Sequence, residues 1–463
     1  MKKVLLIGAG DVGTHLLEFA ARDESNIEWV VGDVDKEKAQ WACNNAEIGA
    51  AHHGLHPLFR AVQIDLFDED ATVELLQKEK PDAVINCTVL HTWHLIRQLP
   101  EELYAKISSA GLGAWLPCQL ALGLSLSKSI QDSGLSPYFI NTSLSCLTNP
   151  VMGKVGLAPT IGIGNVDLIA PAVLTYIAQQ KGIDRSRIET FQVCHHQHWV
   201  FPREAGYQPG APYYLKILID GEEVTRDFDT DEVMYESVKL YAPGIGFTTV
   251  SASSALKNLK AMLFNENLRT HSPGPNGLPG GYPGLLNKDG ADVVLPDDIS
   301  LEEAIRMNEE SGKLDSIEDI KDEGTVIFTD RAFEIMKETL GFECRSFQAW
   351  EAKELAFEQG KKSADFFKNP QTSALGLRVP VAVGDFLILQ AIRESNGYAL
   401  TVSDKELMDG VKMIGKHEGI FSAPEGGATV AALPKLLELG MIHQNDRVIC
   451  FITGSGLKYV DLY

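Results

Sequence analysis

The chain has 463 residues, of which 63 are acidic and 41 are basic, so its formal net charge at pH 7 is −22. A surface this acidic repels phosphate backbones, which excludes nucleic acid as a partner. Hydrophobic residues make up 44% and charged residues 22%, as is typical of globular proteins. The length predicts two or three domains.

Cysteine usage and the N-terminal segment bear on location. Seven cysteines are scattered without CxxC spacing, which favours reduced thiols in a cytoplasm. The segment after Met1 contains only a short apolar run, typical of a strand rather than a signal peptide, and no apolar run has the length of a membrane span. We expect a cytoplasmic protein without membrane contact.

The first 35 residues alternate strand, glycine-rich turn, helix and strand. They run through an apolar strand at Lys2–Ile7, the turn Gly8-Ala9-Gly10-Asp11-Val12-Gly13, a helix at Thr14–Arg22 and a strand at Ile27–Val31. Gly8 permits a tight turn, Gly10 lets backbone N–H groups approach a pyrophosphate, and Gly13 lets the helix pack close to the sheet. The helix N-terminus favours phosphate groups. This pattern predicts a dinucleotide site.

An acidic residue follows the second strand. Asp33 comes about 20 residues after Gly13, where a carboxylate can accept hydrogen bonds from both ribose hydroxyls and repels a 2′-phosphate. NAD is therefore the favoured cofactor, while Lys36 and Lys38 leave NADP open.

The alternation of strands and helices continues to about residue 150. We expect strands at Ala61–Leu66, Ala83–Thr88 and Tyr138–Thr142, and helices at 68–80, 101–109 and 119–132. The end of the strand at 83–88 is where the nicotinamide-side ribose lies in a doubly wound Rossmann domain. The predicted cofactor-binding residues are Gly8, Gly10, Asp11, Val12, Gly13, Asp33, Asp65, Asn86 and Cys87.

The pattern changes beyond residue 150 to an α+β domain with an antiparallel sheet. An apolar helix is expected at Val166–Lys181, followed by period-two strands at 189–201, 213–219 and 222–228, with a hairpin turn at Asp220-Gly221. Residues 265–283 are rich in Pro and Gly and predict a linker or a rigid wall. Acidic helical sequence follows at 300–341, and a charged helix at 349–366. The expected domains are 1–150, 151–365 and 366–463.

Residues 1 to about 180 resemble the saccharopine dehydrogenase-like family of NAD(P)-dependent amino-acid dehydrogenases. The likeness rests on the glycine turn, on Gly32-Asp33-Val34-Asp35 and on Ile64-Asp65. It implies a Rossmann fold and hydride transfer to or from a substrate such as an imine. Beyond residue 185 the likeness is one of layout only.

The last 95 residues resemble the C-terminal part of threonine synthases, which are pyridoxal-phosphate (PLP) enzymes of fold type II. The matching segments are 371–380, 391–395, 402–404, 418–421, 424–428 and 453–459. The resemblance implies that Thr453 and Ser455 would meet the pyridine nitrogen. The family's Schiff-base lysine and phosphate loop have no counterpart between residues 185 and 370, so PLP is not expected in the single chain, and a structural or oligomer-forming role is favoured.

Histidines supply the candidate acid–base groups. Cys194, His196 and His198 alternate within a predicted strand, so they are expected to share one face, with His195 on the other. The spacing admits a zinc site, but a polar sheet face is the simpler interpretation, and we expect no metal. His196 and His198 are candidates to move the proton that accompanies hydride transfer.

Two further groups are candidates for substrate contact. His91 and His94 follow the strand at 83–88 and share a helical face with Arg97, which could hold a carboxylate; an exposed helix is the alternative. Arg269 and His271, at the start of the Pro/Gly segment, could close over a substrate or belong to a rigid connector.

Together these features predict a cytoplasmic NAD(P)-dependent oxidoreductase acting on an amino acid, amine or keto acid. We expect a homo-oligomer. Two alternatives stay open: a threonine synthase-like lyase completed by another polypeptide, and a non-enzymatic protein that senses NAD through domain closure.

Overall fold

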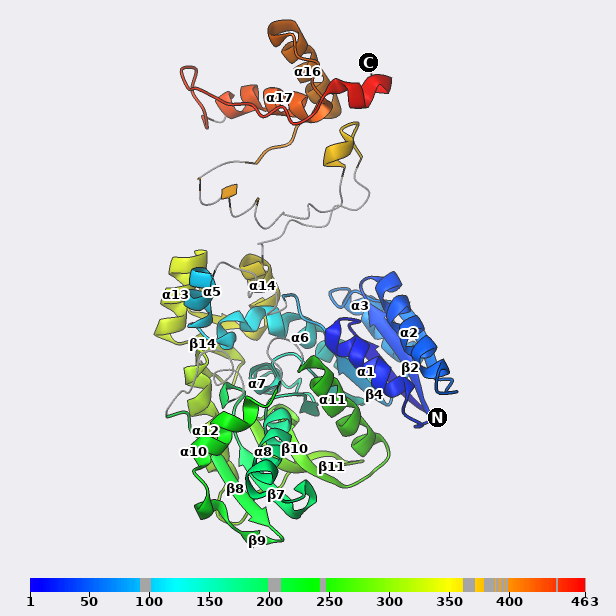
Figure 1. Cartoon of the computed structure of the whole chain (residues 1–463), viewed down its shortest axis with the longest axis vertical. Coiled ribbons are helices and arrows are strands. Elements are labelled where there is room, and N and C mark those ends of the chain that lie inside the picture. Colours follow the sequence, from blue (N-terminus) through cyan, green and yellow to red (C-terminus); the bar gives the residue numbers. More distant parts are fainter. Residues whose placement is uncertain are drawn as a thin grey trace. The chain divides into compact units, whose positions relative to one another are not determined.

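A computed structural model describes residues 1–91, 101–198, 210–241, 247–360, 371–378, 399–438 and 440–462, together with residues 388, 391, 392 and 395. The chain divides into two compact units, Met1–Gln359 and Gly360–Tyr463 (Figure 1). Each unit is described by itself. Among the described residues, no helix combines the length and the hydropathy that crossing a bilayer requires.

Unit 1 begins with a six-stranded parallel sheet. Its strands are β1 (Lys2–Ile7), β2 (Ile27–Asp33), β3 (Leu58–Gln63), β4 (Ala83–Asn86), β5 (Tyr138–Asn141) and β6 (Ile161–Gly162), in the order β3-β2-β1-β4-β5-β6. Ile7 is in register with both Gly32 and Asn86, so β1, β2 and β4 end at one edge. This is the doubly wound order whose carboxyl edge binds ligands, and it confirms the predicted α/β fold.

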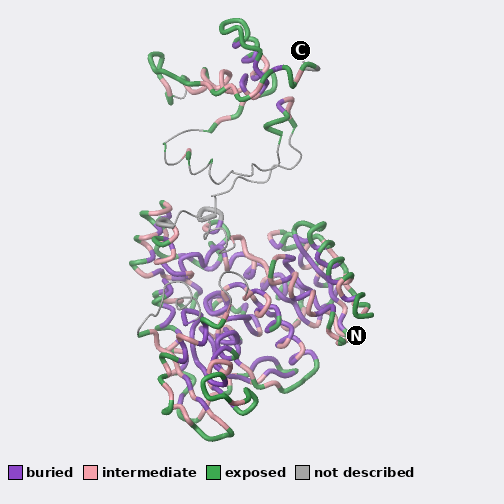
Figure 2. Tube along the Cα trace, viewed as in Figure 1, coloured by how far each residue is buried: buried purple, intermediate pink, exposed green. Residues whose placement is uncertain are grey.

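Helices cover both faces of this sheet. Among the described residues these include α1 (Asp11–Ala21), α2 (Lys36–Ala51), α3 (Glu69–Glu79), α6 (Leu116–Asp132) and α7 (Ser145–Lys154), whereas α5 (Glu101–Ser108) packs against α13 (Asp330–Leu340). Side chains alternate along β1, so that Val4 and Leu6 join one buried cluster while Leu5 and Ile7 join another. Buried residues accordingly fill the strands β1, β2, β4 and β5, whereas the edge strand β3 has none (Figure 2). A strand hydrophobic on both faces must be central, which is why β1 lies mid-sheet.

The rest of unit 1 is α+β with three antiparallel sheets. They are β7 (Ile188–Val193), β8 (Tyr214–Ile219) and β9 (Glu222–Glu223); β10 (Leu268–Pro273), β11 (Gly281–Asn287) and β12 (Gly290–Val293); and β13 (Ile317–Ile320), β14 (Thr325–Phe328) and β15 (Ser346–Gln348). The helices are α8 (Val166–Lys181), α10 (Thr230–Val238), α11 (Thr248–Leu263), α12 (Leu301–Leu314), α13 (Asp330–Leu340) and α14 (Ala352–Gly360). Short 3-10 turns lie at Leu112–Trp115, Arg185–Arg187, Thr225–Asp227, Pro275–Gly277 and Ala349–Glu351.

Two predicted elements of this region were wrong, and one alternative of a third prediction is excluded. The strand expected at 222–228 ends at Glu223 and gives way to a 3-10 turn. The acidic stretch 300–341 is two helices separated by the β13–β14 hairpin, not continuous helix. The Pro/Gly segment, predicted as a linker or a rigid wall, is not a linker, because β10 and β11 pair across it. A Cβ on Gly281 would lie 2.3 Å from Cγ1 of Val166, so this glycine permits close packing.

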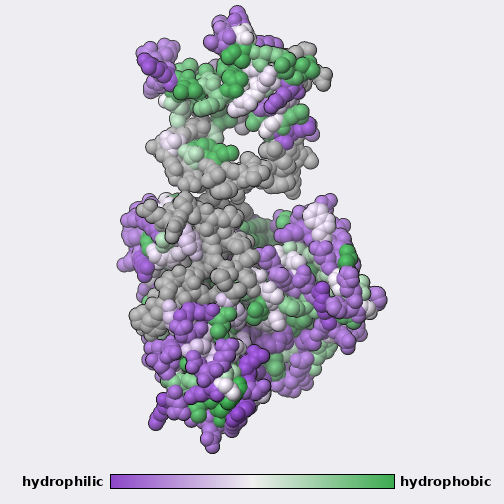
Figure 3. Space-filling model, in the orientation of Figure 1, coloured by the Kyte–Doolittle hydropathy of each residue, from purple (hydrophilic) through white to green (hydrophobic). Residues whose placement is uncertain are grey.

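In the described part of unit 2, the helices α16 (Asp404–Glu418) and α17 (Pro424–Glu438) pack together, and 3-10 turns lie at Leu375–Leu377 and Gly456–Leu462. A capping box between Ser403 and Glu406 starts α16, and Gly419 ends it in the left-handed conformation. Large apolar side chains stay exposed, among them Ile449 at 80% and Phe451 at 74%. The space-filling view shows hydrophobic surface over this unit (Figure 3).

Candidate functional site

The glycine turn between β1 and α1 has the geometry of a phosphate cradle. Gly8 has φ of +104°, and a Cβ there would lie 2.6 Å from the carbonyl oxygen of Cys87. A Cβ on Gly13 would lie 2.0 Å from the carbonyl oxygen of Gly8. A Cβ on Gly10 would meet no atom within 4 Å. The fold therefore requires the first and third glycines, whereas the open space above Gly10 suits an approaching ligand.

The N-terminus of α1 points its first N–H groups into the same turn. Gly10 is the N-cap, and no side chain caps the helix. The first N–H groups of a helix have no partner within the helix, so those at Asp11 and Val12 can receive an anion. Asp11 itself is exposed in the first turn.

Asp33 ties the turn to the end of β2. Its carboxylate is 8% exposed and accepts hydrogen bonds from the backbone N–H groups of Ala9 at 2.8 Å and Asp35 at 3.0 Å. Lys38 Nζ lies 3.8 Å from the same carboxylate. Asp65 at the end of β3 is exposed and accepts from the N–H of Phe67 at 2.9 Å. Asp33 thus shapes the turn as well as offering a carboxylate beside it.

The ends of β4 and β5 carry a buried amide network. Asn86 Nδ2 donates to Asn141 Oδ1 at 2.9 Å, and Asn141 Nδ2 donates to Asn149 Oδ1 at 2.9 Å. Thr88 Oγ1 donates to Asn86 Oδ1 at 2.6 Å. Burial raises the pKa of the Cys87 thiol to about 12, so this sulfur is not a thiolate. The network fixes the strand ends that a nicotinamide would meet.

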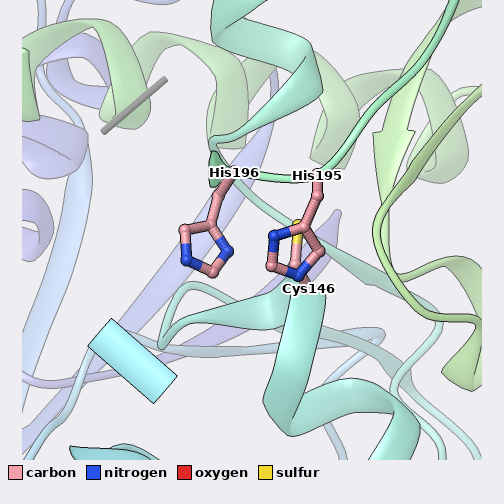
Figure 4. Close-up of side chains that lie close together, drawn as sticks. All are labelled: Cys146, His195 and His196. Atoms are coloured by element: carbon pink, nitrogen blue, oxygen red, sulfur yellow. The ribbon is translucent and has the colours of Figure 1, made fainter. Parts of the chain in front are cut away.

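A second group of polar side chains lies just past the same edge. Cys146 follows β5 in the first turn of α7, and His195 and His196 follow β7 (Figure 4). One atom from each side chain, the sulfur and two ring nitrogens, lies within 4.8 Å of the others. All three residues are buried, and the two rings have centroids 4.2 Å apart. We call these three residues the Cys–His cluster.

A carboxylate holds one of the histidines. Asp315 Oδ2 lies 2.7 Å from His196 Nε2, and Asp315 Oδ1 accepts from the backbone N–H of Leu112 at 2.8 Å. Burial lowers the pKa of His196, but the Asp315 charge outweighs it and raises the pKa to about 10. Ser316, which follows Asp315, has φ of +82°, a strained conformation found mostly at functional positions.

The predicted face of Cys194, His196 and His198 was wrong. β7 ends at Val193, and a helical turn begins at Gln197, so the alternation stops before the histidines. His195, expected on the opposite face, belongs to the Cys–His cluster, and burial holds its pKa well below the usual range. His198 is outside it, with Nδ1 3.2 Å from the His195 carbonyl and Nε2 3.3 Å from that of Ala211.

Cys146 and His195 also line a cavity of about 680 Å³. Its other walls include Asn308, Glu309 and Lys313 of α12. Burial raises the pKa of Glu309. The cluster is therefore buried from bulk solvent but borders a space large enough for a small molecule.

Arg269 and His271 line a different cavity, of about 530 Å³, between α8, α11 and the strands β7 and β10. Lys257 Nζ lies there 2.6 Å from Asp167 Oδ1, a carboxylate that also accepts from Asn258 Nδ2 at 3.2 Å. His271 Nε2 accepts from the N–H of Gln192 at 3.0 Å, and burial lowers the pKa of His271 to about 4. The structure thus brings these two predicted substrate residues together.

The remaining candidates are spread out. His91 follows β4, and its carbonyl accepts from Gln119 Nε2 at 3.1 Å. His94 and Arg97 lie outside the described residues. Thr453 and Ser455 are exposed in unit 2. The sequence did not predict Cys146, His195 or Asp315 as site residues. Cys146 could have been found, because it lies four residues after the strand predicted at 138–142, at the edge of the sheet where ligands bind in this fold.

Comparison with known proteins identifies both ends of the chain. Residues 4–95 match the family model described as the saccharopine dehydrogenase NADP binding domain. The N-terminal resemblance is confirmed. The protein therefore carries an NAD(P)-binding domain of the dehydrogenase type, and Gly10 and Asp33 lie within the matched residues.

Residues 346–454 match the family model of pyridoxal-phosphate dependent enzymes. Over 106 residues the chain is 40% identical to the threonine synthase of Methanocaldococcus jannaschii, which covers 23% of this chain and 26% of that protein. The threonine synthase of Methanosarcina acetivorans is 37% identical over 22% of this chain and 25% of its own length. The chain thus spans about a quarter of the curated relatives it matches, and the C-terminal resemblance is confirmed.

Solved structures resemble unit 1 more loosely. Malate dehydrogenase from Plasmodium falciparum has a TM-score of 0.47 at 15% identity, over 73% of this chain and all of that one. Lactate dehydrogenase from Eimeria maxima has a TM-score of 0.48 at 13% identity, over 67% of this chain and 90% of that one. Likeness at this level bears on neither activity nor substrate.

Proposed function

We propose that the protein is a nicotinamide-dependent oxidoreductase acting on an amino acid, amine or keto acid, with NAD favoured over NADP. The observation that carries the proposal is the placement of two groups at one sheet edge: the glycine cradle after β1, and the Cys–His cluster after β5. When bound, the nicotinamide supplies or accepts the hydride. The described residues supply binding, orientation and proton transfer.

His196 is the best-placed acid–base residue. Asp315 fixes the orientation of its ring and stabilises its protonated form, as a carboxylate does for an imidazole that must hold and release a proton. The neighbouring cavity is lined by Cys146 and His195, and the ring of His195 lies against that of His196, with centroids 4.2 Å apart. His198 is a weaker candidate, because its ring nitrogens face the carbonyl oxygens of His195 and Ala211. His91 and His94 stay predictions from the sequence.

Arg269 is proposed to hold a substrate carboxylate. The positive charge of Lys257 is compensated by Asp167, whereas no ion pair of Arg269 occurs within the described part of the chain. An exposed guanidinium beside a cavity is suited to bidentate recognition of a carboxylate.

Fluorescence titration with NADH and NADPH tests the proposal directly. We expect NADH to bind more tightly, because the Asp33 carboxylate repels a 2′-phosphate, and we expect Asp33→Asn to narrow the difference. Lys78→Ala, an exposed change on α3, is the matched control. Absence of binding by either nucleotide would overturn the proposal, and tighter binding of NADPH would overturn the preference.

A second candidate function concerns unit 2. Its match to pyridoxal-phosphate enzymes and its exposed Ile449 and Phe451 favour a segment that another polypeptide covers and completes into a lyase. That function predicts an aldimine absorption band near about 410–420 nm when the completing chain and PLP are added. A colourless mixture argues against it.

A further inference from the structure

We propose that Cys146, His195 and His196 form a zinc-binding site. A thiolate and two imidazoles are the ligands that zinc takes in catalytic sites with three protein ligands. The three come from two separate segments, the start of α7 and the turn after β7, and their side chains point toward one another (Figure 4).

The first support is a set of buried polar atoms without partners. Within the described residues, His195 Nε2 and His196 Nδ1 have no hydrogen-bond partner, although both side chains are buried. An unpaired polar atom in the interior costs about 1–3 kcal/mol. Two unpaired nitrogens beside a sulfur therefore destabilise the fold, and a metal ion bound to both nitrogens would remove that cost.

The second support is spacing. The three ligand atoms lie within 4.8 Å of one another. Zinc–nitrogen bonds of about 2.0–2.1 Å and a zinc–sulfur bond of about 2.3 Å, arranged tetrahedrally, place ligand atoms roughly 3.3–3.6 Å apart. The ligand atoms would therefore need to approach one another by up to about 1.5 Å when the metal binds.

The third support is the arrangement of the neighbouring polar groups. His196 Nε2 faces Asp315 at 2.7 Å, which leaves Nδ1 for a metal, and Leu112 N–H anchors the other oxygen of Asp315. Asn165 Nδ2 lies 2.9 Å from Cys146 Sγ and donates to the sulfur. A carboxylate that orients a histidine ligand is the usual support of a zinc site.

Three protein ligands leave a fourth position, and two of the ligands border the 680 Å³ cavity. A zinc site that keeps one position open can polarise a substrate oxygen or nitrogen. That use rests on the proposed oxidoreductase function, and it would take the place of proton transfer by His196, because a zinc-bound imidazole is held in its neutral form. The binding of zinc itself does not rest on that function.

The proposed zinc ligands are Cys146, His195 and His196, whereas the strand alternation predicts Cys194, His196 and His198. Variants of Cys194 and His198 are therefore matched controls for variants of Cys146 and His195. The full-length protein is stripped with a chelator, reloaded with zinc, and its metal content measured by mass spectrometry. We expect about one zinc per chain, lost in Cys146→Ala and His195→Ala and retained in Cys194→Ala and His198→Asn. Asp315→Asn should weaken zinc binding about 10- to 100-fold.

Cobalt provides a spectroscopic readout of the sulfur ligand itself. Co²⁺ in the wild-type site should give a sulfur-to-metal charge-transfer band, which Cys146→Ser removes and Cys194→Ser retains. Protein that takes up neither metal, or a Cys146→Ser variant with an undiminished band, would overturn the proposal. Zinc binding without NADH binding would sustain this site and overturn the oxidoreductase function, so the two failures are distinguishable.

Discussion

Replacing Gly10 with alanine separates ligand binding from folding in the glycine turn. Gly10 has φ of −83° and ψ of −164°, an extended conformation that alanine adopts freely, and its Cβ would meet no atom within 4 Å. Gly10→Ala should therefore leave the free energy of unfolding unchanged or raise it by about 0.4–1 kcal/mol, because alanine restricts the unfolded chain.

The same change, Gly10→Ala, should weaken the binding of NADH. The new methyl group would occupy the space through which the pyrophosphate approaches the backbone N–H groups of α1. Losing one charge-assisted hydrogen bond there costs about 1.5–3 kcal/mol, which corresponds to about a 10- to 150-fold weaker Kd for NADH. Fluorescence titration measures the Kd, and thermal melting checks the fold.

Gly13→Ala is the comparison variant, because here the added methyl group should disturb the fold. Its Cβ would lie 2.0 Å from the carbonyl oxygen of Gly8, so backbone must move, at a cost of about 1–3 kcal/mol or more. We expect a lower melting temperature for Gly13→Ala and an unchanged one for Gly10→Ala. A Gly10→Ala protein that binds NADH as tightly as the wild type would refute the reasoning.

Three further changes test other parts of unit 1. Burial lowers the pKa of His271 to about 4, below its value of about 6.5 in the unfolded chain. The contribution of neutral His271 to the stability of the fold is therefore complete above about pH 6.5 and falls as the pH drops toward 4. Between pH 7 and pH 5, the free energy of unfolding measured in urea should fall by about 2 kcal/mol more in the wild type than in His271→Gln. An equal fall in both proteins would contradict this. Arg269→Ala should raise KM for a carboxylate substrate about 10- to 100-fold with little change in kcat, whereas exposed Arg185→Ala should change neither. Gly281→Ala should destabilise the protein by about 1–3 kcal/mol, because its methyl group would collide with Val166. Gly312→Ala in α12, where a Cβ meets no atom within 4 Å, should stabilise the protein by up to about 1 kcal/mol. A higher melting temperature for Gly281→Ala and a lower one for Gly312→Ala would refute the packing argument.

The nucleotide fold could be predicted because its signals are local. The turn from Gly8 to Gly13 and the apolar runs of β1 and β4 lie within a few residues of one another, and each restricts its own backbone. The hairpin turn at Asp220-Gly221, with positive φ at both residues, was predicted for the same reason. Periodicity located the other elements less well: the strand expected at 61–66 is β3 at Leu58–Gln63, and the sixteen-residue helix α2 was not predicted.

The Cys–His cluster could not be predicted in that way. Cys146, His196 and Asp315 are far apart in the sequence and meet only after β5, β7 and α12 have packed. Alternation suggested that Cys194 and His198 accompany His196, but the strand ends first at Val193. A period-two pattern holds only while the backbone stays extended, and the sequence carries no marker for the end of β7.

The two ends of the chain differ in how much of a site each contains, and this difference argues for unit 1 as the place of chemistry. Unit 1 combines a ligand cradle, two cavities and buried ionisable groups, and its apolar strands are covered on both faces. Unit 2 matches about a quarter of its relatives and leaves Ile449, Phe451 and Leu457 exposed by more than 70%. Exposed apolar surface of this kind marks a surface that something else covers, whereas a reaction site must hold its own polar groups in place. Unit 1 meets that requirement within the described residues.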